Sequence, residues 1–420
     1  MRPRQQRLSL GLAILLIAFP AYPNYRSITL AAFAQSSTQE KPKLRDFGSS
    51  LKRLKWDPKK RAAVETSNAT DKREDGAHED VISVETRLVT CDVSVIDRNG
   101  RNVSALTKSD FIIADNGLPQ QIGHFSLGSD QDIPRSIVLI IDYSSSELPY
   151  IDDSIDAAKS LVDKLGPKDR LAIVTDDVEL LVDFSSDKMA LRSALESVKQ
   201  KVARHRFGRS RQFTALMATV REMFSAEDIR PIIIFQTDGD ELNFLAPYDP
   251  SLLASIANLP LGSKPKQSPF MEFSLNDVYT AAEKSRATIY TVIPNTRLLG
   301  VAPAEQLKRV TTMMTTRNPR LHLDGHELAN YADHLVRQQT AAAGPAVVTG
   351  GWTVFLERPD QAAAMYAAIL ADVNNRYLIG YYPTNKLYDG KRHKVLIEVR
   401  DHPEYNIEGR KFYYAAGPEE

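Results

Sequence analysis

Two uninterrupted apolar runs constrain the fold of this chain more than any other feature of its sequence. Residues 137–141 read Ile-Val-Leu-Ile-Ile, and residues 232–235 read Ile-Ile-Ile-Phe. A strand with no polar alternation is buried on both faces, as a strand is inside a parallel sheet covered by helices. The two runs therefore predict the central strands of an α/β domain.

The segments around these runs alternate between strand and helix patterns. Apolar residues spaced three or four apart indicate helices, and short apolar stretches between them indicate further strands. This alternation favours a doubly wound, mostly parallel sheet, which we assign to residues 134–375. The expected helices lie near 151–165, 191–202, 216–224 and 361–373, and the further strands near 171–174, 178–184 and 288–293.

The segments on either side of the α/β domain have a β pattern. In residues 81–128, Val89, Cys91, Val93 and Val95 alternate onto one face, and turn signals separate the short runs. Residues 376–414 show β signals again. We expect these two parts to join into one β-sandwich into which the α/β domain is inserted, with Cys91 as a small core side chain.

The N-terminus has the pattern of a secretory signal. Three arginines precede an apolar run at 8–18, and Ala32-Phe33-Ala34 offers a cleavage site. We predict that residues 1–34 are a signal peptide and that the protein is secreted or held in the periplasm or cell envelope. An uncleaved N-terminal anchor is the alternative, and no later stretch approaches the length of a membrane span. Residues 35–80 are polar and are expected to be a flexible linker.

The charge balance bears on the class of partner. The chain has 53 Lys and Arg and 53 Asp and Glu, and the first 34 residues hold four arginines and no acid. Removing them leaves a slightly acidic protein, which argues against nucleic acid as the partner.

Oxygen-bearing side chains follow the two central strands. Asp142, Ser144 and Ser146 form a D-x-S-x-S arrangement after the first strand, and Thr237-Asp238 follows the second. Ligands of open parallel sheets lie beyond the carboxyl ends of the strands. Thr214, at the start of a helix, is a further oxygen donor. A set of oxygen ligands suits a hard cation, Mg²⁺ above all, with Mn²⁺ or Ca²⁺ as alternatives.

These motifs resemble a known family site. Asp142-x-Ser144-x-Ser146, Thr214-Ala-Leu216 and Thr237-Asp238-Gly239 look like the metal-ion-dependent adhesion site of the von Willebrand factor type A domain, over roughly residues 134–372. The flanking segments 81–125 and 376–383 also resemble the exported acidobacterial proteins related to this domain. The resemblance implies that Asp142, Ser144, Ser146, Thr214 and Asp238 hold the metal. It also implies that an acidic side chain of a protein partner completes the coordination.

The sequence departs from the family pattern at three places near this site. Gln212-Phe213 stands where many relatives have two glycines, which bears on the position of Thr214. Asp240 and Glu241 add two acids, and a proline-rich stretch at 245–273 follows them. Five basic residues precede Thr214 and either attract an acidic partner or form a solvated loop. They are Arg204, His205, Arg206, Arg209 and Arg211.

Three functions are compatible with these patterns. The first is an exported, metal-dependent protein-binding or adhesion module without catalysis. The second is a structural envelope-assembly module whose metal site is vestigial. The third is a metal-dependent hydrolase, for which acid-rich residues 238–241 are the only signal, because no nucleophile stands beside an evident general base. We expect the protein not to be an enzyme.

Overall fold

The computed structural model describes residues 88–130, 133–225, 230–246, 273–317, 323–384 and 389–415, with the backbone alone at 52–57 and 62–65. The predicted signal peptide, most of the predicted linker and most of the proline-rich stretch lie outside these residues. Residues 301–334 form a compact unit separate from the unit that holds the sheets. This smaller unit contains α6 (Pro303–Arg317) and the beginning of α7 (Gly325–Thr349).

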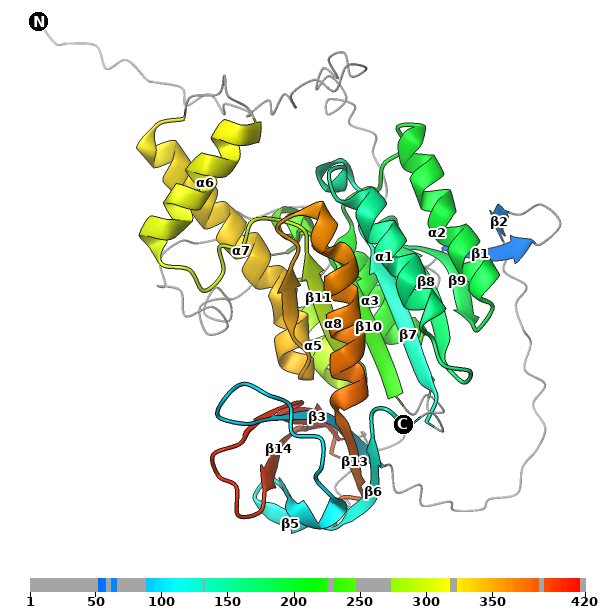
Figure 1. The fold of residues 1–420 in the computed structure, drawn as a ribbon, viewed down its shortest axis with the longest axis vertical. Helices are drawn as coiled ribbons and strands as arrows, with labels where there is room; N and C mark the ends of the chain where they lie inside the picture. Colours follow the sequence, from blue (N-terminus) through cyan, green and yellow to red (C-terminus); the bar gives the residue numbers. More distant parts are fainter. Residues whose placement is uncertain are drawn as a thin grey trace, which may run out of the picture. The chain divides into compact units, whose positions relative to one another are not determined.

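The large sheet is α/β in character and mostly parallel, as the sequence predicts. Its strand order is β12-β11-β10-β7-β8-β9-β1-β2 (Figure 1). The strands from β12 to β8 in this order run parallel to their neighbours, and β9 returns antiparallel to β8. The strands are β7 (Arg135–Ile141), β8 (Arg170–Thr175), β9 (Glu179–Ser185), β10 (Arg230–Gln236), β11 (Thr288–Ile293) and β12 (Thr353–Phe355).

Part of the segment predicted as a flexible linker is instead β-structure. Strand β1 (Lys52–Asp57) pairs parallel with β9, and β2 (Ala62–Glu65) pairs antiparallel with β1. Leu54 and Trp56 alternate with charged residues in this stretch, which is the sequence pattern of a strand. The polar composition of the whole segment concealed this short alternation.

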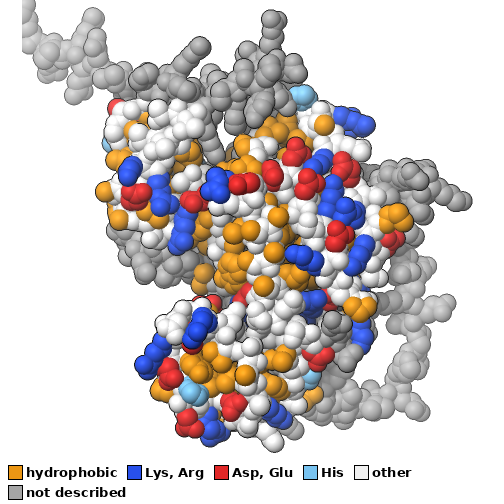
Figure 2. Space-filling view, in the orientation of Figure 1, with side chains coloured by type: hydrophobic (Ala, Val, Ile, Leu, Met, Phe, Trp, Pro, Cys, Tyr) orange, Lys and Arg blue, Asp and Glu red, His pale blue; other side chains and the backbone are white. Residues whose placement is uncertain are grey.

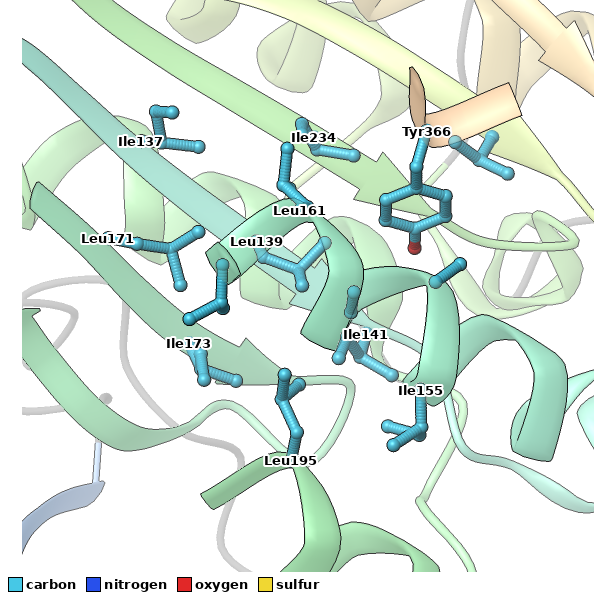
Figure 3. Close-up of a cluster of buried hydrophobic side chains, with 14 of the residues drawn as sticks. Ile137, Leu139, Ile141, Ile155, Leu161, Leu171, Ile173, Leu195, Ile234 and Tyr366 are labelled. Carbon is cyan, nitrogen blue, oxygen red and sulfur yellow. The ribbon is translucent and has the colours of Figure 1, made fainter. Parts of the chain in front are cut away.

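Helices cover both faces of the sheet because β7 is apolar on both. Ile137, Leu139 and Ile141 point into one core, formed with α1, α2 and α8 (Figure 3). Val138 and Ile140 point into the other, formed with α3, α5 and part of α7. In Figure 1, α1 and α8 lie in front of the sheet. The helices are α1 (Ile151–Asp163), α2 (Lys188–Ala203), α3 (Gln212–Glu222), α5 (Leu275–Lys284) and α8 (Ala362–Asn375).

Helix α7 has a proline inside it. The helix continues through Gly344-Pro345 to Thr349, although a proline in a helix interior usually breaks the helix. Proline lacks the N–H that would bond to the carbonyl of Ala341. Here the hydroxyl of Tyr279 donates to that carbonyl at 3.0 Å, and Gly344 leaves room for the tyrosine ring. A tertiary contact therefore replaces the missing hydrogen bond.

The two flanking segments join as predicted. One four-stranded sheet has the order β15-β3-β13-β6 and the other β16-β14-β4-β5, so each combines strands from before and after the α/β domain. Cys91 is fully buried in their shared core, and burial raises its thiol pKa to about 12. The strands are β3 (Val89–Ile96), β4 (Phe111–Asp115), β5 (Leu118–Gln120), β6 (Ile122–Leu127), β13 (Tyr377–Tyr381), β14 (Arg392–Val399), β15 (Asn406–Glu408) and β16 (Phe412–Tyr414).

A buried ion pair connects the two folds within the larger unit. Arg230 of β10 donates to both carboxylate oxygens of Asp92 in β3, each at 3.0 Å. Both side chains are almost fully buried, and Arg230 also donates to the carbonyl of Gly128. A bidentate pair of this kind fixes orientation as well as distance. It therefore ties the β-sandwich to the lower end of the sheet, away from the carboxyl ends of the strands.

The outer surface of α1 and α2 carries charges of both signs (Figure 2). Lys159 contacts Asp156 and Glu196, and Lys199 also contacts Asp156. In each pair the acid is exposed and the lysine is largely covered, and partly exposed pairs of this kind contribute little to stability. Among the described helices, none combines the length and the apolarity needed to cross a bilayer.

Candidate metal centre

Three acidic residues lie just after neighbouring strands of the large sheet. Ile141 of β7 lies in register with Gln236 of β10 on one side and with Thr175 of β8 on the other. The chain after β7 goes to β8, whereas β10 lies on the opposite side, so the strand order reverses at β7. Such a reversal opens a crevice at the carboxyl ends of the strands. Asp142, Asp176 and Asp238 follow these strands, so all three lie at this edge of the sheet.

The loop after β7 holds its carboxylate and hydroxyls in a tight turn. Asp142 is fully buried and accepts a hydrogen bond of 2.9 Å from the backbone N–H of Ser144. The hydroxyls of Ser144 and Ser146 lie 3.0 Å apart. This Asp-centred turn places one anionic and two neutral oxygens on one side of the crevice.

The loop after β10 lies opposite the loop after β7. The backbone N–H of Asp240 donates to Asp238 at 3.1 Å, and a side-chain hydrogen bond joins Ser146 to Asp238. Gly239 has φ +78°, and a Cβ there would come within 2.6 Å of the Gln338 carbonyl. Only glycine fits this turn without strain. The structure thus brings four of the five predicted ligands, Asp142, Ser144, Ser146 and Asp238, to one place.

Gln212 lies among these carboxylates. Its amide Nε2 donates to Asp142 at 2.6 Å and to Asp240 at 2.7 Å, with Asp238 at 3.4 Å. The side chain is fully buried. An amide donor therefore supplies positive character at the point where acidic oxygens from two loops converge.

Thr214 is buried two residues further along α3, where its hydroxyl and its backbone N–H both donate to Glu241. The hydroxyl is thus directed at a carboxylate of the chain itself. Its role as a metal ligand stays a prediction. The departure at Gln212-Phe213 accompanies this arrangement, because Gln212 takes the space between the acids.

A group of carboxylates, with Asp142 and Glu147 buried and Asp238 half-buried, has the donor chemistry of a divalent cation site. Asp142, Glu147 and Asp238 each offer an oxygen, and these oxygens lie within 4.8 Å of one another. Glu147 Oε2 is buried without a hydrogen-bond partner. In the described part of the chain, no lysine or arginine forms an ion pair with these three residues. Buried carboxylates without a compensating positive charge are costly, so the site fits a cation.

The electrostatics of the site reflect this missing compensation. Burial, followed by the charges of Asp176 and Asp238, raises the pKa of Asp142 well above its usual value. Burial, followed by the charge of Asp142, also raises the pKa of Glu147 well above its usual value. Burial and the charges of Asp238 and Asp142 raise the pKa of Asp240 to about 8. Without a cation, the site therefore retains protons near neutral pH.

Asp176 connects the site to the basic loop between α2 and α3. Its carboxylate accepts hydrogen bonds from the backbone N–H of Tyr143 at 3.2 Å and of Ser210 at 2.8 Å. A Cβ on Gly208 would come within 2.0 Å of this carboxylate. The basic loop is therefore packed against the loop of Asp142, and its exposed Arg209 lies 3.9 Å from Asp177.

Three residues of the site were not identified from the sequence. Asp176 follows an apolar strand as Asp142 does, and that position is the signal that could have found it. Glu147 was overlooked because an acid directly after Ser146 also fits the first turn of a helix. The amide of Gln212 gave no signal, because its contacts depend on packing between distant loops.

Replacing Gln212 with alanine is expected to tighten Mg²⁺ binding. The cation then no longer has to displace an amide that hydrogen-bonds to Asp142 and Asp240. A hydrogen bond to a charged group contributes roughly 1.5–3 kcal/mol, so the gain should be on the order of tenfold. Isothermal titration calorimetry would measure it. Weaker binding by the variant would mean that Gln212 supplies an oxygen ligand instead.

Residues 137–241 match the family described as the von Willebrand factor type A domain. No curated protein matches the chain significantly. Similar solved structures include the vWF domain of the type V pili tip protein Mfa5 from Porphyromonas gingivalis, with 15% identity, a TM-score of 0.35, and coverage of 58% of this chain and 95% of that one. BatB from Bacteroides thetaiotaomicron has 15% identity and a TM-score of 0.31, with coverage of 57% of this chain and 98% of that one. The PilB minor pilin from Streptococcus sanguinis has 11% identity and a TM-score of 0.30, with coverage of 58% of this chain and 61% of that one.

The family match and the fold agree over residues 137–241, which match the von Willebrand factor type A domain and form part of a mixed, mostly parallel sheet. Two antiparallel four-stranded sheets come from the flanking segments. At the carboxyl ends of its central strands, this domain has an acidic cluster with the chemistry of a cation site.

Proposed function

We propose that this protein is an exported, divalent-metal-dependent protein-binding or adhesion module without catalytic activity. We also propose that the predicted signal peptide directs it to the periplasm, the cell envelope or the exterior, as in the acidobacterial proteins it resembles. The main support is the acidic cluster of Asp142, Glu147 and Asp238, of which Asp142 and Glu147 are buried and Asp238 is half-buried. The cluster lies beside two serine hydroxyls and has no basic partner among the described residues.

Asp142, Ser144, Ser146 and Asp238 would hold the cation, with Thr214 as the further predicted ligand. The bound ion supplies a positive centre to which a carboxylate can bind. Oxygen donors and waters are the ligands that Mg²⁺ prefers, and Mn²⁺ and Ca²⁺ accept similar ones. The residues of this chain orient that centre toward the crevice and hold it between two loops.

The basic loop supports an acidic partner. Arg204, Arg206 and Arg209 are exposed. The loop is joined to the site loop by the hydrogen bond from Gly208 N to the Tyr143 carbonyl at 3.2 Å. Exposed positive charge beside a binding site speeds the association of an acidic partner and weakens with salt. This arrangement favours a protein ligand that offers an acidic side chain over nucleic acid.

The proposal predicts Mg²⁺-dependent retention of an envelope protein. Immobilised full-length mature protein is incubated with envelope extract in Mg²⁺ or in EDTA, and retained proteins are identified and then purified for direct binding. Retention should be lost in EDTA and with Asp142→Asn, but kept with Asp152→Asn, whose side chain is exposed. Equal retention in all four conditions would contradict metal-dependent binding.

A structural module with a vestigial metal site is the second candidate. Two contacts favour it: the Gln212 amide fills the space between the acids, and Thr214 donates to Glu241. A hydrolase is less well supported, because Asp240 and Glu241 are occupied by these same two residues. For the structural module, partner binding should be unchanged by EDTA.

A further inference from the structure

Glu147 is an unusual residue to find buried at this position. It is the residue directly after the D-x-S-x-S motif and the last residue of the short helix η3 (Ser145–Glu147). Its side chain is only 1% exposed. Its backbone N–H donates to the Ser144 carbonyl at 3.1 Å, so its position is fixed relative to the serines. A glutamate is rarely buried to this extent without a partner.

The contacts of this carboxylate are incomplete. A side-chain hydrogen bond joins it to Gln236, which is itself held by Tyr366 at 2.8 Å and Ser154 at 3.2 Å. The other oxygen, Oε2, is fully buried and has no hydrogen-bond partner in the described part of the chain. An unpaired buried carboxylate oxygen is destabilising unless another group compensates it.

The spacing of the oxygens identifies the kind of group that is missing. One oxygen each of Asp142, Glu147 and Asp238 lie within 4.8 Å of one another. Two oxygens on opposite sides of a Ca²⁺ ion are about 4.6–5.2 Å apart, since each lies about 2.3–2.6 Å from the ion. The three carboxylates therefore lie close enough together to share one coordination sphere.

We propose that Glu147 is a direct ligand of the cation and that its carboxylate makes this site selective for Ca²⁺ over Mg²⁺. This inference rests on the metal site of the proposed function and adds a ligand that the D-x-S-x-S pattern does not include. Mg²⁺ is usually held by one or two carboxylates and keeps several waters, whereas Ca²⁺ accepts more protein oxygens. Three carboxylates around one divalent ion also retain it without a partner, so a partner's acidic side chain has to compete with Glu147.

Titration calorimetry with Ca²⁺ and with Mg²⁺ tests this assignment on four forms of the mature protein: wild type, Glu147→Gln, Asp142→Asn and Asp152→Asn. Losing a residue that only orients a metal ligand costs about 10–100-fold in affinity. Glu147→Gln should therefore weaken Ca²⁺ binding at least about tenfold and Mg²⁺ binding less. Asp152→Asn should bind both ions as wild type does. Glutamine matches glutamate in size, and the melting temperature of Glu147→Gln in EDTA should equal or exceed that of wild type.

Each outcome is decisive. Unchanged Ca²⁺ binding by Glu147→Gln, while Asp142→Asn loses it, would overturn the role of Glu147 and leave the metal site standing. An equal loss for both ions would indicate a distorted loop and would also overturn the assignment. If wild type binds neither ion, both this inference and the metal-dependent function fail. If the ratio of Ca²⁺ affinity to Mg²⁺ affinity is smaller for Glu147→Gln than for wild type, the result supports Glu147 as a direct ligand.

Discussion

Asp142→Asn is expected to abolish binding of divalent cations. Asp142 is fully buried between the loop of the serines and the loop of Asp238, and it is the only residue of the D-x-S-x-S motif that carries charge. An amide can offer one neutral oxygen but cannot offset the charge of the ion. Because disturbing even an indirect support costs about 10–100-fold, the loss here should exceed about 100-fold. Calorimetric titration with Mg²⁺, Mn²⁺ and Ca²⁺ would measure it.

The matched control for this variant is Asp152→Asn. It makes the same chemical change ten residues later, at a side chain that is 78% exposed on α1. It should leave cation binding unchanged. In EDTA, Asp142→Asn should melt at or above the wild-type temperature, because it removes a charge that burial and neighbouring acids disfavour. Retained binding by Asp142→Asn would exclude this residue as the anchor of the ion.

Raising the pH from about 5 to about 8.5 in EDTA is expected to lower the free energy of unfolding. Burial raises the pKa of Asp176 and of Asp240 to about 8 and that of Glu241 to about 7. In the unfolded chain these groups ionise near pH 4. Between pH 4 and 8 the folded state therefore holds more protons than the unfolded state, so stability falls as the pH rises.

Chemical denaturation at pH 5 and pH 8.5 would measure this effect, with EDTA or with saturating Mg²⁺. The cation offsets the negative charge of the site, so the fall should be smaller when it is bound. Asp240→Asn should also show a shallower fall in EDTA, because it removes one of the groups with a raised pKa. A stability that rises across this range in EDTA would contradict the electrostatic description of the site.

Much of the fold follows from local sequence pattern. The apolar runs at 137–141 and 232–235 correctly predicted central strands buried on both faces, because no other environment suits such runs. The joining of the flanking segments also followed, since each has alternating residues that need a second sheet to cover them. What local pattern missed was decided by distant contacts. Helix α7 continues through Pro345 only because Tyr279 supplies the missing hydrogen bond.

The candidate site divides in the same way. Asp142 and Asp238 were predictable because the carboxyl ends of neighbouring parallel strands meet at one edge of a sheet. The convergence of Gln212 on Asp142 and Asp240, and of Thr214 on Glu241, arises from how α3 packs against the loop after β10. The spacing of residues along the chain does not predict such contacts. Glu147 was hidden for a related reason, because its burial and its contact with Gln236 of β10 join residues that are far apart in the sequence.

The most direct test of this description is whether the metal-free wild-type protein takes up one divalent cation per chain at these residues. Mn²⁺ is titrated into the mature protein and its electron paramagnetic resonance signal is followed, in parallel with Asp142→Asn and Asp152→Asn. We predict one Mn²⁺ bound by wild type and by Asp152→Asn, displaced by Mg²⁺ or Ca²⁺, and none bound by Asp142→Asn. Free Mn²⁺ throughout the wild-type titration, or equal binding by all three proteins, would contradict it.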